Sequence, residues 1–178
     1  MWNNCAKTYI IKITLLYNSI MDDKQLDFMK MAVELSLQGQ RENKGGPFGA
    51  VIVKDGKVVG KGYNKVTSTN DPTAHAEIVA LRDACQNLGS FQLDGCEVYT
   101  SCEPCPMCLG AIYWARPTVV YFGNTRQDAA NIGFDDSMIY EEIKSDISKR
   151  KIPMVQVGEE LAIHAFEEWK SKQDKIDY

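Results

Sequence analysis

Two cysteines and one histidine are spaced so that they can bind one metal ion. Cys105 and Cys108 lie three residues apart. Proline suits the first turn of a helix, because the amide proton that it lacks would have no intrahelical partner there, so a helix is expected to begin at about Pro104. Positions i and i+3 share one helix face, and the helix N-terminus favours thiolates. His75 completes a predicted set of three ligands.

A glutamate beside this set points to hydrolysis. Three protein ligands leave one position of a tetrahedral zinc open to water, as in catalytic sites. Zinc lowers the pKa of such a water from about 15.7 to about 7, so hydroxide forms at neutral pH. Glu77 lies two residues after His75, and the two side chains can converge where a helix end points into the site. We therefore expect Glu77 to carry protons and not to bind the metal.

A closed structural site is the alternative. Cys102, Cys105 and Cys108 follow one another at three-residue intervals, so Cys102 has the spacing of a fourth ligand. A structural zinc normally uses four protein ligands. Against this, Cys102 ends a strand-like run and lies on the other side of the Pro104 turn. Its other expected role is that of a small buried hydrophobic residue.

The composition describes one acidic, globular chain. At 178 residues and 44% hydrophobic, it can bury about 70% of its unfolded surface in one core. A net charge of -4 counts against a nucleic-acid partner, whose phosphates are bound by clustered basic residues. The basic run Lys149–Lys151 is interpreted as a solvated loop, with nucleic-acid contact as the lesser alternative.

The cysteines and the N-terminal segment bear on location. Three of the six cysteines lie in the metal motif, and thiolate ligands need a reducing or metal-protected setting, which predicts a cytoplasmic protein. Residues 1–20 contain an apolar patch broken by Lys12, too short to span a bilayer, which takes about 20 apolar residues. No small-residue cleavage site precedes Met21. We predict a leader over residues 1–20 without a role in the chemistry, and no membrane partner.

Apolar spacing predicts strands and helices that alternate along the chain. Helices are expected at residues 23–39, 72–87, 104–116 and 161–169. Strands are expected at residues 48–53, 57–63, 97–100, 118–122 and 153–157, with Asp55-Gly56 turning the first into the second. This alternation predicts an α/β fold of three layers, with a five-stranded sheet between helices.

The motifs together resemble a known family. H-x-E combined with P-C-x-x-C is a signature of zinc deaminases. The matching segments are Gly45–Val53, Asn70–Glu77, Tyr99–Pro117, Gly133–Asp136 and Tyr178. Over nearly all of residues 22–178 the chain resembles the cytidine deaminase superfamily, and within it the bacterial guanine deaminases. The resemblance implies a three-layer α-β-α fold with a mixed sheet, and a zinc-dependent deaminase domain over residues 21–178.

The resemblance also implies a reaction. Members of this family remove the 2-amino group of guanine by hydrolysis, giving xanthine and ammonia, as a step of purine catabolism or salvage. His75, Cys105 and Cys108 would bind Zn²⁺, and zinc-bound hydroxide would attack C2. Glu77 would pass the proton to N3 and then to the departing amine, a transfer that accelerates such reactions by about 10²- to 10⁴-fold.

Four further residues are implied to contact the purine. Asn64 and Asp136 are assigned to recognition, since an amide suits the lone-pair edge of guanine and a carboxylate suits its N–H groups. Asp136 can also relay protons. The alternatives are that Asn64 caps a turn, that Asp136 is a solvated or helix-capping acid, and that the neighbouring Asp135 has its role. Phe48 and Trp114 are expected to stack on the base, or else to belong to the core.

The last implication concerns Tyr178. Chain ends are usually poorly ordered, but members of the family use an aromatic C-terminal tail to close the purine site, in some cases on the neighbouring subunit. We therefore expect a homodimer with an exchanged tail, which acts on a small purine base.

Three rival functions remain. A tRNA adenosine deaminase shares the motifs but needs a basic surface and a path for an extruded base. A guanosine deaminase carries much the same segments. A zinc-stabilised interaction module without turnover is the non-enzymatic alternative, and Glu77, which such a module does not need, is the feature against it.

Overall fold

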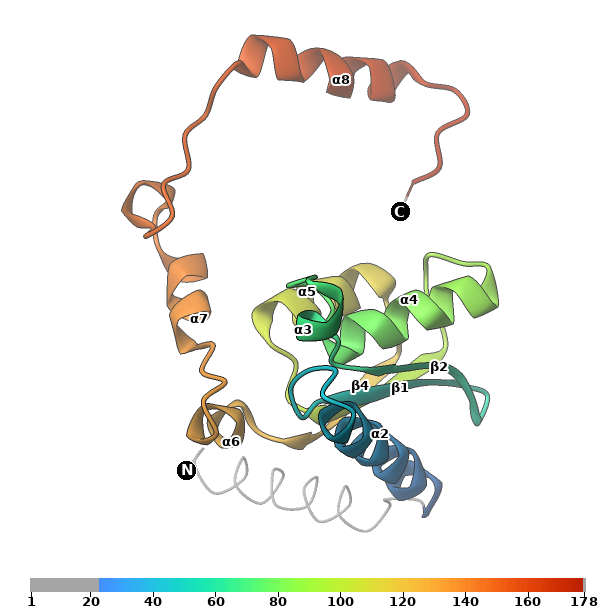
Figure 1. The fold of residues 1–178 in the computed structure, drawn as a ribbon. Helices are drawn as coiled ribbons and strands as arrows, with labels where there is room; N and C mark the ends of the chain where they lie inside the picture. The colour runs from blue at the N-terminus through green and yellow to red at the C-terminus, as the bar shows by residue number, and fades with distance from the viewer. Residues whose placement is uncertain (1–22, 178) are drawn as a thin grey trace, which may run out of the picture. The chain divides into compact units, whose positions relative to one another are not determined.

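The computed structural model describes residues 23–177 (Figure 1). The predicted leader and Tyr178 lie outside the described residues. The chain forms two compact units, Met1–Thr125 and Arg126–Tyr178, and each is described by itself. A single domain from residue 21 to the end stays a prediction. None of the helices between residues 23 and 177 is long and apolar enough to cross a bilayer.

The first unit alternates helices and strands, as expected. Its elements are α2 (Asp23–Arg41), β1 (Gly49–Lys54), β2 (Lys57–Tyr63), α3 (Val66–Thr69), α4 (Ala76–Leu88), β3 (Cys96–Cys102), α5 (Pro106–Ala115) and β4 (Val119–Asn124). Helix α2 begins with an acid and ends with a base, which suits the helix dipole. Its buried residues Ala32, Ser36 and Gly39 recur at helical spacing and form the face toward the sheet.

The sheet has four strands in the order β2-β1-β3-β4. Strand β1 is antiparallel to both β2 and β3, whereas β3 and β4 are parallel, so the sheet is mixed, as predicted. Opposite residues include Val51 and Tyr99 in β1 and β3, and Thr100 and Phe122 in β3 and β4. The parallel pair requires a crossover, and α5 provides it.

The prediction of a fifth strand at Pro153–Val157 is wrong. These residues have no regular secondary structure. Their apolar, β-prone composition resembles that of a strand, but a strand exists only where its backbone pairs with another, and Pro153 lacks an amide proton to donate. Composition alone therefore overestimated the size of the sheet.

Helices cover both faces of the sheet, which confirms the three-layer α/β fold. Helix α2 lies on one face, and α4 and α5 lie on the other (Figure 1). The alternation of β1 shows why, because Ala50 and Ile52 face the cluster under α4 and α5, while Val51 and Val53 face the cluster under α2. A strand buried on both faces reads as a continuous apolar run.

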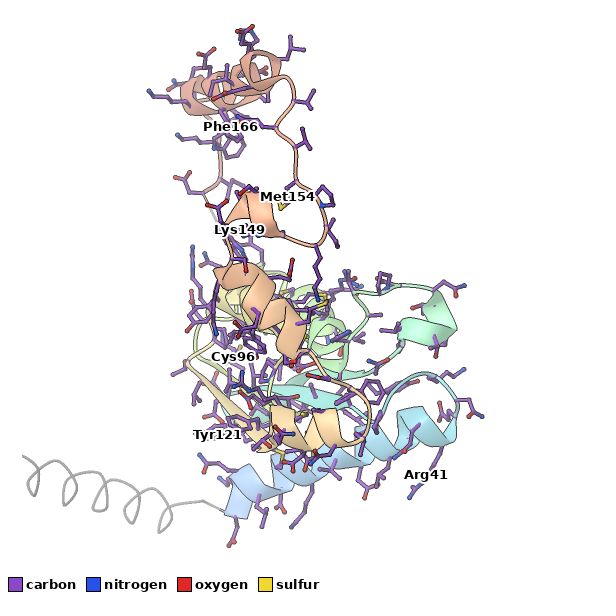
Figure 2. All side chains as sticks on the ribbon, turned by 90° about the vertical axis from the view of Figure 1, so that its left-hand side faces the viewer. Arg41, Cys96, Tyr121, Lys149, Met154 and Phe166 are labelled. Atoms are coloured by element: carbon purple, nitrogen blue, oxygen red, sulfur yellow. The ribbon has the colours of Figure 1, made fainter. Side chains whose placement is uncertain are left out.

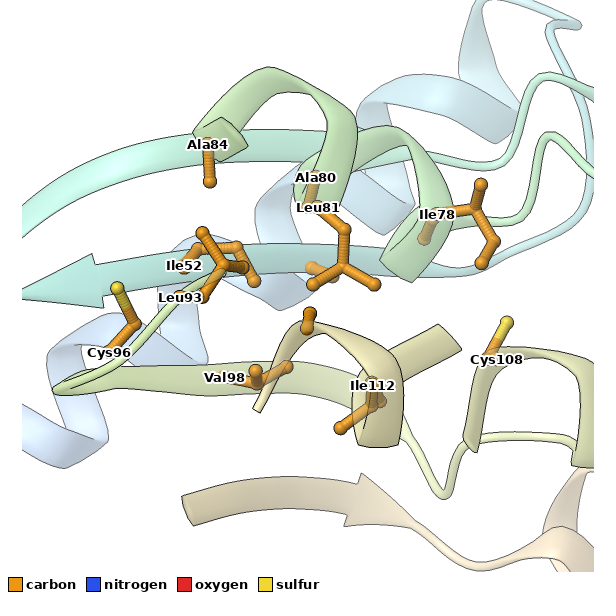
Figure 3. Close-up of a cluster of buried hydrophobic side chains, with 13 residues drawn as sticks. Ile52, Ile78, Ala80, Leu81, Ala84, Leu93, Cys96, Val98, Cys108 and Ile112 are labelled. Atoms are coloured by element: carbon orange, nitrogen blue, oxygen red, sulfur yellow. The ribbon is translucent and has the colours of Figure 1, made fainter. Parts of the chain in front are cut away.

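The larger core cluster joins α4, α5 and the sheet. Ile52 and Val98 from the sheet pack with Leu81 of α4 and Ile112 of α5 (Figure 3). Cys108 belongs to the same cluster. The core therefore fixes the position of the two helices whose N-termini carry the predicted metal ligands.

The second unit consists of short helices. These are α6 (Arg126–Asn131), α7 (Ser137–Lys144), the 3-10 helix η1 (Ile147–Lys149) and α8 (Glu159–Ser171). Helix α8 includes the predicted helix at residues 161–169. Many of its apolar side chains are exposed, among them Phe166 (Figure 2).

Close packing of α4 on β2 depends on a glycine. A Cβ atom at Gly62 would lie 2.3 Å from the carbonyl oxygen of Ala76 and 2.5 Å from the amide nitrogen of Ala80. Both atoms belong to the backbone of α4, so no side-chain rotation relieves the overlap. A side chain at residue 62 must therefore push α4 away from the sheet.

We expect Gly62→Ala to destabilise the fold by about 1–3 kcal/mol, as overpacking of a rigid contact does. Gly110→Ala is the matched control, because the Cβ position at this residue of α5 faces open space, with no atom outside its own stretch of helix within 4 Å, and the change should stabilise by about 0.5–1 kcal/mol. Urea unfolding of the three proteins measures both effects. Equal stability of Gly62→Ala and the wild type would contradict the packing argument.

Candidate metal centre

His75 occupies the N-cap position of α4, without a capping hydrogen bond from its side chain. The predicted helix start at Pro72 is wrong, because α4 begins at Ala76. Asp71 accounts for the delay: its Oδ1 accepts hydrogen bonds from the amide and the hydroxyl of Thr73, at 2.8 and 2.7 Å, and so holds residues 71–73 in a turn. His75 has extended backbone angles at the N-cap, and Glu77 lies in the first turn.

Cys105 has the same place at the start of α5. This helix begins at Pro106 and not at about Pro104, and Cys105 is its N-cap. A residue that precedes proline is disfavoured in the helical region, so Cys105 is extended and the second proline defines the first turn. Cys108 follows in that turn and is fully buried.

The two helix starts bring three metal donors together. His75 Nδ1 lies 3.5 Å from Cys105 Sγ and 3.6 Å from Cys108 Sγ. All three donor atoms lie within 4.8 Å of one another. A tetrahedral zinc with bonds of about 2.0 Å to nitrogen and about 2.3 Å to sulfur separates its ligands by roughly 3.5 Å. The set therefore fits zinc in both donor type and spacing.

The two thiols differ in acidity. The contact with Cys108, together with that to His75, lowers the pKa of Cys105 to about 4. The same contact and burial raise the pKa of Cys108. One sulfur is thus already a thiolate at neutral pH, and this is the form in which cysteine binds zinc.

Glu77 lies next to these donors but outside the set. Its side chain is only 6% exposed, and its Oε2 lies 3.5 Å from Cys108 Sγ. Burial raises the pKa of the Glu77 carboxyl. A carboxyl with a raised pKa holds its proton more firmly than a solvated one, which suits a group that donates a proton.

Cys102 is not part of the donor set. Its side chain is 5% exposed, and Sγ donates a hydrogen bond to the carbonyl oxygen of Thr125 at 3.6 Å. Within residues 23–177, the group of His, Cys, Asp and Glu side chains that can hold a metal consists of His75, Cys105 and Cys108. The closed site with Cys102 as fourth ligand therefore lacks support.

Asn64 follows β2 and is 5% exposed. Its Oδ1 accepts hydrogen bonds from the amides of Gly46, at 3.3 Å, and Val66, at 3.2 Å. The bond to Val66 is the turn cap that the sequence offered as an alternative. The bond to Gly46 was not predicted, although the Gly45-Gly46 pair is the local signal of a close backbone approach.

The two aromatic candidates differ in environment. Phe48 is half-buried and packs against the core cluster of α4 and α5. Its carbonyl oxygen accepts the amide of Asn64 at 3.0 Å, so the two residues are neighbours. Trp114, near the end of α5, is 64% exposed.

The two aspartates lie in the second unit. Asp135 Oδ1 accepts the amide of Ser137 at 2.9 Å, and this bond lowers the pKa of the Asp135 carboxyl. Asp136 is the N-cap residue of α7, without a capping bond from its side chain. Both line a pocket of about 180 Å³ together with Arg126 and Tyr140. The carboxylate of Asp135 is thus engaged in a local turn.

Comparisons with known proteins agree with this centre. Residues 22–124 match the cytidine and deoxycytidylate deaminase zinc-binding region. Guanine deaminase from Bacillus subtilis (strain 168) is 54% identical over 151 residues, which is 85% of this chain and 97% of the relative. A tRNA-specific adenosine deaminase from Agrobacterium fabrum is 44% identical over 97 residues, 54% of this chain and 62% of the relative.

A solved structure extends the likeness to the fold. The X-ray structure of guanine deaminase from Bacillus subtilis has a TM-score of 0.83 and 53% sequence identity, and the match covers 85% of this chain and 97% of the other. The zinc-binding region, the ligand geometry and this structural match lead to one conclusion. The chain belongs to the cytidine and deoxycytidylate deaminase family of zinc-binding proteins.

Proposed function

We propose that this protein hydrolyses guanine to xanthine and ammonia. The observation that carries the proposal is the length of the match to guanine deaminase, which covers 85% of the chain. The zinc-binding region ends at residue 124, and the match to the tRNA-specific adenosine deaminase covers only 54% of the chain. A match over 151 residues has to include residues of the second unit, which lies beyond the end of the zinc-binding region at residue 124.

His75, Cys105 and Cys108 are proposed to hold zinc. Bound there, zinc activates water for attack at neutral pH. His75 and Cys105 are the N-cap residues of α4 and α5. The positive ends of the two helix dipoles therefore lie beside the metal donors and stabilise the cysteine thiolates. A cytoplasmic location is part of the proposal, because reducing conditions keep the sulfurs available.

Glu77 is proposed to move the protons. It takes a proton from the attacking water, delivers it to N3 of guanine, and then protonates the 2-amino group, so that ammonia leaves and not an amide anion. Its burial and raised pKa support this role. Water adds to C2, and the bond between C2 and the exocyclic amino nitrogen breaks. Guanine and water thus give xanthine and ammonia.

The remaining site residues are proposed to bind the base. The Asn64 amide would donate to the lone-pair edge, and the Asp136 carboxylate would accept from ring N–H groups. Asp136 is preferred to Asp135 because of the family resemblance, and the Asp135 carboxylate accepts the Ser137 amide. Phe48 and Trp114 would stack on the ring, as aromatic side chains do.

A homodimer is part of the proposal. Tyr178 would close the purine site, with the C-terminal tail exchanged between subunits. The family resemblance supports this arrangement, and sedimentation of the purified chain measures whether it is a dimer.

A substrate panel tests the function directly. We expect ammonia release from guanine, and little or none from guanosine, adenine, cytosine or tRNA, when each is incubated with the zinc-loaded protein. Release only from guanosine would assign a nucleoside substrate, and release only from tRNA would assign a tRNA adenosine deaminase. No release from any of them would favour the interaction module.

The ligand assignment predicts different outcomes for two cysteines. Cys105→Ala should reduce bound zinc from roughly one ion per chain to near zero, because two ligands hold zinc weakly. Cys102→Ala should retain the zinc, since its sulfur bonds to a backbone carbonyl. Elemental analysis after dialysis measures both. Loss of zinc from Cys102→Ala would restore the closed, structural site.

Glu77→Gln separates metal binding from turnover. The variant keeps size and hydrogen bonding but cannot carry the proton, so we expect full zinc content and a fall in kcat of about 10²- to 10⁴-fold. Glu34→Gln, on the exposed part of α2, is the matched control and should retain the rate. A Glu77→Gln variant with unaltered kcat would rule out this proton carrier.

A further inference from the structure

The Asn64 amide is held in one orientation. Its Oδ1 receives two backbone amides, those of Gly46 and Val66. A backbone N–H group can only donate, so the atom between these two groups has to be the oxygen. Among residues 23–177, the side-chain hydrogen bonds of Asn64 all use Oδ1. The Nδ2 group, with two protons to donate, is therefore the part of the amide that remains for a ligand.

Gly45 leaves the space that these two hydrogen bonds to Asn64 Oδ1 require. A Cβ atom at residue 45 would lie 2.2 Å from Asn64 Oδ1, 2.5 Å from its carbonyl oxygen and 2.8 Å from its carbonyl carbon. The last two atoms are backbone, so a new Asn64 rotamer cannot relieve the overlap. Any side chain at residue 45 must displace the loop that carries the Gly46 amide.

The loop is also fixed on its other sides. The carbonyl oxygen of Lys44 accepts the amide of Ser68 at 3.2 Å and the hydroxyl of Thr67 at 3.1 Å. The backbone N–H of Asn64 donates a hydrogen bond to the carbonyl oxygen of Phe48 at 3.0 Å. Residues 44–48 are thus bonded at both ends to residues 64–68, with the Asn64 side chain between them.

We propose that Gly45 is a positioning residue that sets substrate specificity through Asn64. By letting the backbone at residues 45 and 46 approach Oδ1, it fixes the side-chain amide with its acceptor bonded to the loop and its Nδ2 donor left for the base. The site then selects a purine that presents a lone pair to Asn64, and rejects one that presents an amino group. This inference rests on the proposed function, in which Asn64 contacts the base.

Two purines that retain the reactive 2-amino group test the specificity. 2,6-Diaminopurine replaces the 6-oxo acceptor of guanine with a donor, and 7-deazaguanine removes the N7 acceptor. Steady-state kinetics with guanine and both analogues would compare the wild type, Gly45→Ala, Asn64→Ala and the double variant. Gly110→Ala is the glycine-to-alanine control, with open space at its Cβ position.

We expect the wild type to prefer guanine to at least one analogue by about tenfold or more, because a missing hydrogen bond leaves a polar group of the site unpaired. Gly45→Ala should bring this ratio toward one and lower kcat/KM for guanine by about 10- to 100-fold, as misplacement by about 1 Å can do. Zinc content should be unaltered. In the Asn64→Ala background, Gly45→Ala should add less than about twofold, because both act through one group.

The proposal fails if the wild type accepts both analogues as well as guanine, if Gly45→Ala keeps the preference, or if the losses in the double variant multiply. A merely structural role of Gly45 would lower stability without moving the ratio. A wild type inactive on guanine would contradict the proposed function instead. A crystal structure of Gly45→Ala tests whether the hydrogen bond from the Gly46 amide to Asn64 Oδ1 is lost. We expect the distance between these two atoms to exceed about 3.5 Å. An intact hydrogen bond would overturn the proposal.

Discussion

The contact between His75 Nδ1 and the two cysteine sulfurs places the strictest demand on this fold. The histidine precedes the cysteines by 30 and 33 residues, and the donor atoms still lie 3.5 and 3.6 Å apart. Bringing them together requires α4 and α5 on one face of the sheet, with their N-termini side by side. The shared core cluster of the two helices supplies that placement, and the crossover between parallel β3 and β4 puts α5 where it is needed.

The same geometry sets the electrostatics of the centre. Both helices direct their N-termini, and hence the positive ends of their dipoles, toward the donors. Burial acts in the opposite sense on Glu77, whose charged form loses solvation and whose pKa rises. The surroundings therefore act in opposite directions on two neighbouring groups, because the pKa of Cys105 falls while that of Glu77 rises.

Local chemistry made the cluster of His75, Cys105 and Cys108 predictable from sequence. The proline-cysteine spacing limited the ligand set to a helix start, and the structure differs only in using Pro106 in place of Pro104. The four strands of the first unit were also predictable, β1 from its continuous apolar run and β2 from the Asp55-Gly56 turn that precedes it. The failed strand at residues 153–157 had the right composition without a pairing partner. Likewise, the Gly45-Gly46 pair indicates a close backbone approach but does not identify Asn64 as the group that approaches.

The distance along the chain between the ligands has a consequence for how the centre forms. Cys105 and Cys108 lie in one turn, but they supply only two donors, and His75 joins them only after α4 and α5 have packed on the sheet. Such non-local closure is slow compared with the formation of a single turn. In zinc fingers the metal drives folding of a short peptide. Here the three donors meet only where α4 and α5 pack on the sheet, so a metal ion that needs all three requires the packed scaffold.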